Sequence, residues 1–331
     1  MLACLLTMGV LGAMPASATQ PGPMEPATKR VRSEINLILE LHDFLMVATE
    51  GEENQRPEYL TEINAYKQAR EMITDPRAWR FVNDTIVEGP DTAAIAKRAQ
   101  SPPASLSPAD VEGVKKLLQA LSDAWPRFEA QDLVAHRRAL QVVLTSVLRR
   151  QFSGALEKRI MPAVYDKMRF KPIDAPVIVY PVVNAVEIGV SGKTSKGYYV
   201  VIPVSRRPNL RIIEMVVHEV THVLDARQPT PSSSILARIR RAAARATPRI
   251  DDEVLEGFLH GLVAFNAGEM IRRFVRPDYR PLVDVSANLR SHIDAFRSAY
   301  EGPWIEYLDG KLSPEQVIEQ MIAFLKPSGK S

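Results

Sequence analysis

Apolar residues recur with helical spacing through the first half of the chain. Helix start signals accompany the pattern, because Asp75 precedes Pro76 and Ser107 ends a proline- and serine-rich linker at residues 101–108. The clearest apolar stripe consists of Ile35, Leu37, Ile38, Leu41, Phe44 and Leu45. The spacing predicts helices near residues 57–72, from 76 onward, and at 109–124, 127–151 and 154–168.

The pattern changes after Pro172. Three segments rich in β-branched and aromatic residues follow, at residues 177–180, 185–190 and 198–204. Helical spacing then returns at about 208–226, near 282–300 and at 314–325.

These patterns predict an α+β, predominantly helical protein. A helical N-terminal region would cover residues 19–171, and a second domain would cover 172–331. In the second domain a small β-sheet precedes a strongly apolar helix.

That apolar helix carries the motif H-E-x-x-H, formed by His218, Glu219 and His222. Residues four apart share one face of a helix, so both imidazoles can reach one zinc ion. Glu219 is placed to act as general base on a water molecule at the metal. Apart from Thr221, the other positions from Met215 to Leu224 are aliphatic, so two histidines and a glutamate would be costly to bury without a metal. The alternative is a buried helix whose two histidines have ordinary hydrogen-bond partners.

A catalytic zinc needs a third protein ligand and an open fourth position. The metzincin pattern is excluded, because Asp225 and Gln228 occupy its glycine and histidine positions. Further along, Leu255-Glu256-Gly257-Phe258 resembles the N-E-G-F element of aminopeptidase-like gluzincins, a group of zinc metallopeptidases.

By that resemblance the zinc ligands are His218, His222 and Glu256, and Glu219 is the catalytic base. Small Gly257 is expected to let the two ligand helices approach closely. Leu255 replaces the usual asparagine, and the gap between His222 and Glu256 is longer than in the family. Glu253 and Asp252, one turn earlier, therefore stay open as alternative third ligands.

Several residues are candidates for supporting roles. His260, four residues after Glu256, is a candidate to orient a ligand or to stabilise the oxyanion of the tetrahedral intermediate. The competing candidates for oxyanion stabilisation are Tyr279, Tyr198 and Tyr199. Asp225 shares the face of His218, so it is either a carboxylate that orients an imidazole or a solvated residue. We interpret His42 and His136 as ordinary helix residues.

The N-terminus resembles a secretory signal peptide. Residues 1–18 carry no charge, contain an apolar run and end in Ala16-Ser17-Ala18, a small-x-small cleavage site. The run is shorter than the roughly 20 residues of a membrane-spanning helix, so we expect no stable membrane anchor. An exported protein, periplasmic or secreted, is the prediction, and a retained apolar helix is the alternative. The only cysteine, Cys4, would leave with the signal.

Composition adds two limits. The 42 basic and 39 acidic residues give a net charge of +3, too balanced to indicate nucleic acid or an anionic membrane as partner. An arginine-rich segment without acidic residues, at 228–250, lies between the two predicted ligand helices. It is interpreted either as a lid or acidic-substrate site, or as a solvated helix face.

The sequence therefore predicts an exported zinc metallopeptidase with a zincin-like domain, acting on a peptide or protein substrate. An edge strand of the small sheet would pair with the extended substrate. The main alternative is a non-catalytic exported binding module on the same scaffold. A metal-free helical interaction protein is the third possibility.

Overall fold

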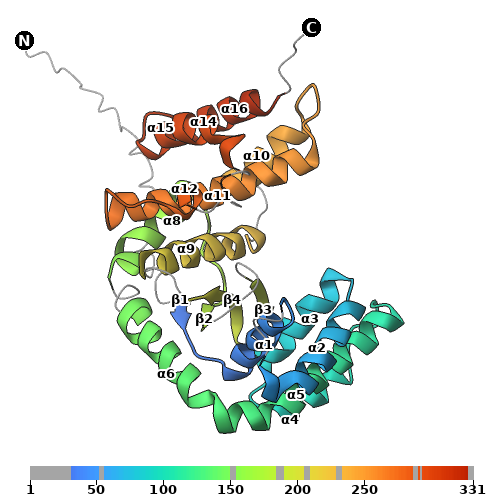
Figure 1. Ribbon diagram of the computed structural model, residues 1–331. Helices are drawn as coiled ribbons and strands as arrows, with labels where there is room; N and C mark the ends of the chain where they lie inside the picture. The colour runs from blue at the N-terminus through green and yellow to red at the C-terminus, as the bar shows by residue number, and fades with distance from the viewer. Residues whose placement is uncertain are drawn as a thin grey trace, which may run out of the picture.

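The computed structural model has a four-stranded β-sheet between two groups of helices (Figure 1). It confirms the predicted α+β, predominantly helical fold. The predicted signal peptide, residues 1–18, lies outside the described residues. The structure describes residues 31–51, 56–149, 154–183, 190–204, 209–228, 233–285, 290 and 293–326.

The strands lie in the order β1-β2-β4-β3. Strands β1 (Val31–Ser33), β2 (Val177–Val182) and β4 (Gly197–Pro203) run parallel, and β3 (Val190–Thr194) pairs antiparallel with β4 at the edge. The two central strands were predicted, whereas β1 was not. The predicted strand at 185–190 lies outside the described residues except for Val190, the first residue of β3. Strand β1 comes from the N-terminal part of the chain, which therefore contributes to the same sheet as the second predicted domain.

Both faces of the sheet are covered. Along β4, Tyr198 and Val200 belong to one apolar core, and Tyr199 and Val201 belong to the other. Alternate side chains of a strand point to opposite faces, so an uninterrupted apolar strand indicates that each face packs on helices. The two cores of the described chain share this sheet.

One face packs on the N-terminal helices, α1 to α5. Asn36, Asp75 and Ser107 cap three of them, each by accepting hydrogen bonds from backbone N–H groups of the first turn. The start signals at Asp75 and Ser107 are thereby confirmed. The helices are α1 (Leu37–Ala48), α2 (Leu60–Met72), α3 (Pro76–Glu88), α4 (Thr92–Ala99) and α5 (Pro108–Gln131).

Helix α5 continues through Pro126, where the sequence predicted a break. Leu121, Ala124 and Phe128 are all fully buried on one side of it. Packing of that side outweighs the hydrogen bond that proline cannot donate. The chain then returns to the sheet through α6 (Leu133–Val143), π-helical turns at Leu144–Arg149 and Leu156–Ile160, and α8 (Met161–Met168).

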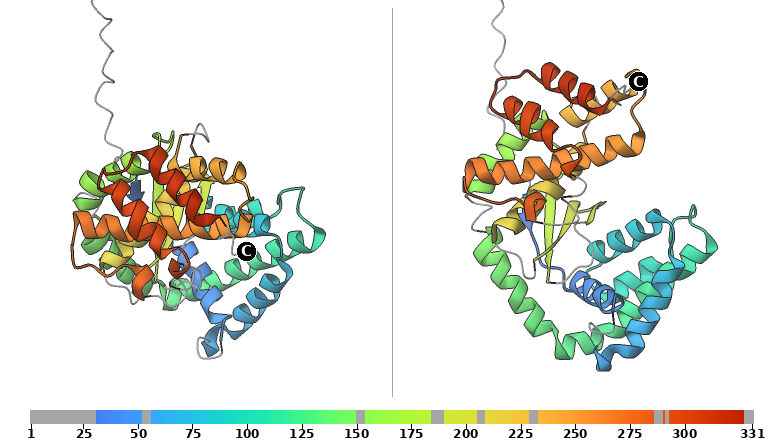
Figure 2. Two further views of the ribbon diagram at one scale, coloured as in Figure 1. Left: turned by 90° about the horizontal axis from the view of Figure 1, so that it is seen from above. Right: turned by 45° about the horizontal axis from the view of Figure 1, so that its top comes forward.

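The other face of the sheet packs on α9 (Asn209–Ala226), the helix with the H-E-x-x-H motif. Helix α11 (Asp252–Phe274) lies on the far side of α9, so α9 is enclosed by the sheet and a second helix (Figures 1 and 2). Its aliphatic positions are accordingly buried.

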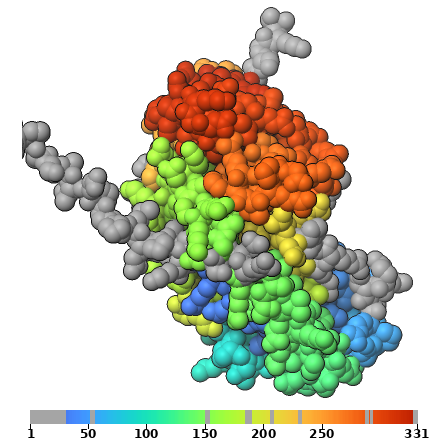
Figure 3. All heavy atoms as spheres, turned by 90° about the vertical axis from the view of Figure 1, so that its left-hand side faces the viewer, coloured from blue at the N-terminus to red at the C-terminus, as the bar shows by residue number. Residues whose placement is uncertain are grey.

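The C-terminal segments lie beyond α11, at the opposite end of the molecule from α2 to α5 (Figures 1 and 3). The predicted helix at 282–300 is instead interrupted within the described residues. The C-terminal segments are α12 (Leu282–Val285), α14 (Arg297–Ala299), a π-helical turn (Tyr300–Trp304), α15 (Ile305–Leu308) and α16 (Pro314–Leu325). Helix α10 (Ile235–Ala244), which precedes α11 in the chain, packs against α16. In the part of the chain that the structure describes, no helix meets the length and apolarity needed to span a bilayer.

Candidate metal centre

His218 and His222 lie one turn apart on α9, and their Nε2 atoms are 3.0 Å apart. The ring centroids are separated by 4.6 Å. The predicted common face is therefore real. Two imidazole nitrogens at this distance can share either a proton or a metal ion.

His260 from α11 completes a triangle with these two rings. Its centroid lies 5.0 Å from that of His218 and 5.1 Å from that of His222. One candidate ligand atom from each of the three histidines lies within 4.8 Å of the other two. The sequence had assigned His260 only a supporting role, four residues after the predicted ligand Glu256.

The three imidazoles could hold a metal ion, and the spacing of His218 and His222 is compatible with tetrahedral zinc. Zinc–nitrogen bonds of 2.0–2.1 Å put two ligand nitrogens about 3.3 Å apart in a tetrahedron, close to the 3.0 Å between His218 and His222. Burial, together with the charges of His222 and His260, lowers the pKa of His218 well below its usual value. Burial also lowers the pKa of His222, to about 4. Neutral imidazole is the form that binds a metal, and His260 is exposed, so solvent reaches the cluster.

Glu219 lies beside this cluster and is almost completely buried, with 6% of its surface exposed. Its Oε1 is 3.7 Å from Nε2 of His218. Burial raises the pKa of Glu219 to about 8. A cation held by the three imidazoles would favour the carboxylate and oppose that shift.

The side chain of Glu256 does not lie where the predicted third ligand was expected. Its side chain is 61% exposed, and its carboxylate binds Arg240 of α10 through Nε at 3.1 Å and Nη2 at 3.4 Å. The imidazole of His260, one turn further along α11, lies where Glu256 was expected. Glu256 is therefore not part of the cluster formed by the described residues.

The two alternative ligands are also outside the cluster. Asp252 is exposed and pairs with Arg249 at 3.0 Å. Glu253, exposed on the first turn of α11, is outside as well. Gly257 does not mediate the helix contact that was expected of it, since a Cβ there would meet nothing within 4 Å. The close approach occurs at Gly268, where a Cβ would lie 3.0 Å from Oε1 of Glu214.

No protein-family model, curated protein or solved structure matches the chain. The function has to be inferred from the residues of the site.

The three tyrosines considered for oxyanion stabilisation each donate to a carboxylate elsewhere. Tyr198 binds Asp174 at 3.0 Å, and Tyr199 binds Asp84 at 2.8 Å. Tyr279 donates to Oε2 of Glu214 at 2.6 Å.

Glu214 was missed by the sequence analysis, although it lies one turn before His218 on the ligand face. Burial raises its pKa to about 7, against the opposing effects of the hydroxyl of Tyr279 and the backbone N–H of Leu282. The bonds to Tyr279 and Leu282 connect the segment that follows α11 to α9. A lone glutamate amid aliphatic residues, four before a ligand, was the available signal.

Asp225 and the arginine-rich segment meet at the other end of α9. Oδ2 of Asp225 accepts from Nη1 of Arg240 at 2.6 Å, and Oδ1 accepts from the hydroxyl of Ser234 at 3.0 Å. Ser234 also caps α10 by accepting from the N–H of Ala237. Within the segment, residues 235–244 form α10, and Arg238 of this helix binds Glu315 of α16 at 2.7 Å.

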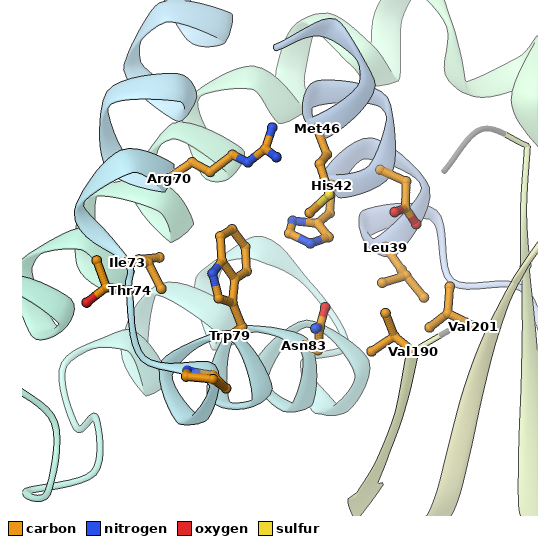
Figure 4. A pocket seen from close by; sticks show the side chains of 12 residues that line it. Leu39, His42, Met46, Arg70, Ile73, Thr74, Trp79, Asn83, Val190 and Val201 are labelled. Carbon is orange, nitrogen blue, oxygen red and sulfur yellow. The ribbon is translucent and has the colours of Figure 1, made fainter. Parts of the chain in front are cut away.

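A separate cavity of about 400 Å³ lies on the other face of the sheet, between α1, α2, α3 and the start of β3 (Figure 4). Arg70, His42 and Trp79 face the same space in Figure 4. His42 is buried and its Nδ1 lies 2.9 Å from the hydroxyl of Tyr66. His42 is thus a residue of α1 with an ordinary buried partner, and the sequence had interpreted it as an ordinary helix residue. His136 likewise pairs with a buried glutamate, Glu40, at 2.5 Å.

His42 should make the fold sensitive to acid. Burial, assisted by the charge of Arg70, lowers its pKa to about 4, against 6.5 in an unfolded chain. Between these values the unfolded chain binds a proton that the folded protein does not, so stability falls as the pH falls. We expect wild type to lose about 2 kcal/mol more than His42→Gln between pH 7 and pH 5.

Urea unfolding at both pH values, with a chelator present throughout, measures this difference. The chelator removes any contribution from the metal centre, and the titrations of His218 and His222 are common to both proteins. Equal pH dependence in the two proteins would mean that His42 titrates normally in the fold.

Proposed function

We propose that this protein is a zinc-dependent metallopeptidase whose metal is held by His218, His222 and His260. The observation that carries the proposal is the convergence of three imidazoles from two helices beside the buried carboxyl group of Glu219. Three histidines and an open fourth position are a known ligand set of catalytic zinc. A structural zinc site would have four protein ligands and would not need a buried carboxyl group such as that of Glu219 beside it.

When bound, zinc would polarise a substrate carbonyl and lower the pKa of a water molecule. Glu219 would accept the proton of the attacking water and deliver it to the leaving amine. Its position supports this role, because a buried carboxylate beside the cluster is placed to accept a proton from the attacking water and to release it later. Thr221 takes no part, since its hydroxyl donates to the carbonyl of Val217.

A peptide is the favoured substrate because of the sheet beside the site. Strand β3 is at the edge of the sheet, antiparallel to its neighbour, and contacts α9. An extended peptide can add to such an edge through backbone hydrogen bonds, with its scissile bond directed towards α9. The balanced net charge of +3 supports a peptide or protein partner over a nucleic acid. The apolar N-terminus supports export to the periplasm or medium.

Metal analysis combined with an unbiased cleavage assay tests the proposal. The purified protein should contain one zinc per chain and cleave members of a mixed peptide library. A chelator should abolish cleavage, and added zinc should restore it. A protein that binds no metal under any condition contradicts the proposal. Stoichiometric zinc without cleavage would instead favour the non-catalytic binding module.

A further inference from the structure

Arg240 links the ends of the two ligand helices. From α10 it donates to Asp225 of α9 at 2.6 Å and to Glu256 of α11 at 3.1 Å. Asp225 is three residues after His222, and Glu256 is four residues before His260. The guanidinium therefore lies within about one helical turn of two of the three imidazoles.

Glu256 lies one helical turn before His260, a member of the cluster, on the same helix. Residues four apart stack on one face of a helix, and side chains lean towards the N-terminus of their helix. The imidazole of His260 therefore leans towards the turn that carries Glu256. A glutamate oxygen binds zinc at 2.0–2.2 Å and would make a fourth protein ligand. Four protein ligands leave no position for water or substrate.

The guanidinium of Arg240, which binds Glu256, is also held in place by Asp225. Both oxygens of Asp225 are engaged, one by Arg240 and one by the buried Ser234. The Asp225 side chain is only 11% exposed, and the Arg240 side chain is 38% exposed. Arg240 thus has a buried partner on one side and the exposed carboxylate of Glu256 on the other. Glu256 also receives two hydrogen bonds from the planar guanidinium, an arrangement that lysine could not reproduce.

We infer that Arg240 is a positioning residue that holds Glu256 away from the metal and so keeps the fourth coordination position open. The inference rests on the metal centre of the proposed function. It also explains why a glutamate in a ligand-like sequence context is directed away from the three imidazoles. Without Arg240, Glu256 would close the site and make it resemble a structural zinc centre.

Cobalt(II) can report whether the fourth coordination position is open. It accepts imidazole and carboxylate ligands, and its visible spectrum changes with coordination. We would load the full chain with cobalt and titrate it with azide, a small anion that needs an open position. Wild type should show a saturable azide-dependent spectral change. In Arg240→Met the change should need about tenfold more azide or disappear, since a tethered carboxylate competes at millimolar effective concentration or above.

Three further proteins make the test specific. Arg238→Met removes a neighbouring arginine of α10 that pairs with Glu315, and it should respond like wild type. The double variant Arg240→Met with Glu256→Gln should regain the azide response, which a merely structural defect would not do. Glu256→Gln alone should keep both its cobalt and its azide response, and it tests the inference even if Arg240→Met does not fold.

An unchanged azide response in folded Arg240→Met overturns the inference, and so does a double variant that is not rescued. Loss of cobalt from Glu256→Gln also overturns it, because Glu256 would then be a ligand from the outset. The first two outcomes leave the proposed metallopeptidase function standing, and the third changes its ligand set. A wild type that binds neither cobalt nor zinc refutes the metal centre and this inference together.

Discussion

Glu219→Gln should keep its zinc and lose peptide hydrolysis by about 10²–10⁴-fold or more. Glutamine has nearly the size of glutamate, so the buried position next to His218 can accommodate it. It cannot accept a proton from water or return one to the leaving amine. Because Glu219 is not one of the three clustered ligands, metal content should not change.

The measurement compares wild type and Glu219→Gln on one peptide library at equal zinc occupancy. Glu253→Gln is a matched control, since it makes the same chemical change at an exposed glutamate outside the cluster. It should cleave like wild type. Cleavage that persists at the wild-type rate in Glu219→Gln would indicate a contaminating protease or a mechanism without this base.

His260→Ala should lose stoichiometric zinc, with an affinity loss well beyond the 10–100-fold that outer-shell substitutions cause. Two remaining imidazoles, both on α9, cannot enclose a metal that needs three protein ligands. Loss of the metal should also lower the melting temperature, because the folded state loses the free energy of zinc binding. His222→Ala should behave in the same way.

Competition titration against a chromophoric chelator measures the zinc affinity of each variant. Glu256→Gln is the informative comparison, since the gluzincin resemblance makes Glu256 the third ligand and the structure places His260 in the cluster. We expect Glu256→Gln to bind zinc like wild type. Wild-type affinity in His260→Ala, with loss of zinc in Glu256→Gln, would reverse the assignment.

Local physics explains which fold features the sequence predicted. Helix caps at Asp75 and Ser107 depend on a side chain and the N–H groups two or three residues later, so they can be recognised without any tertiary contact. Features that depend on distant partners were missed. Strand β1 exists because it pairs with β2, about 145 residues later in the chain, and Pro126 is tolerated in α5 because its neighbours are buried.

In the candidate metal centre, too, some residues were predicted from local sequence and others depended on tertiary contacts. His218, Glu219 and His222 follow from the sequence alone, because the spacing of four residues on a helix fixes a common face whatever surrounds it. Which residue of α11 joins His218 and His222 depends on how α11 is rotated about its own axis and on where α11 lies along α9. Helix α11 is closely packed at Gly268, where a Cβ would meet Pro281 and Glu214, and at Phe258, whose carbonyl accepts from the hydroxyl of Tyr300. In this packing His260 joins the two histidines of α9, and Arg240 pairs with Glu256. No local pattern encodes the choice between His260 and Glu256, since both lie on the same face of one helix and only contacts with α9 and α10 distinguish them.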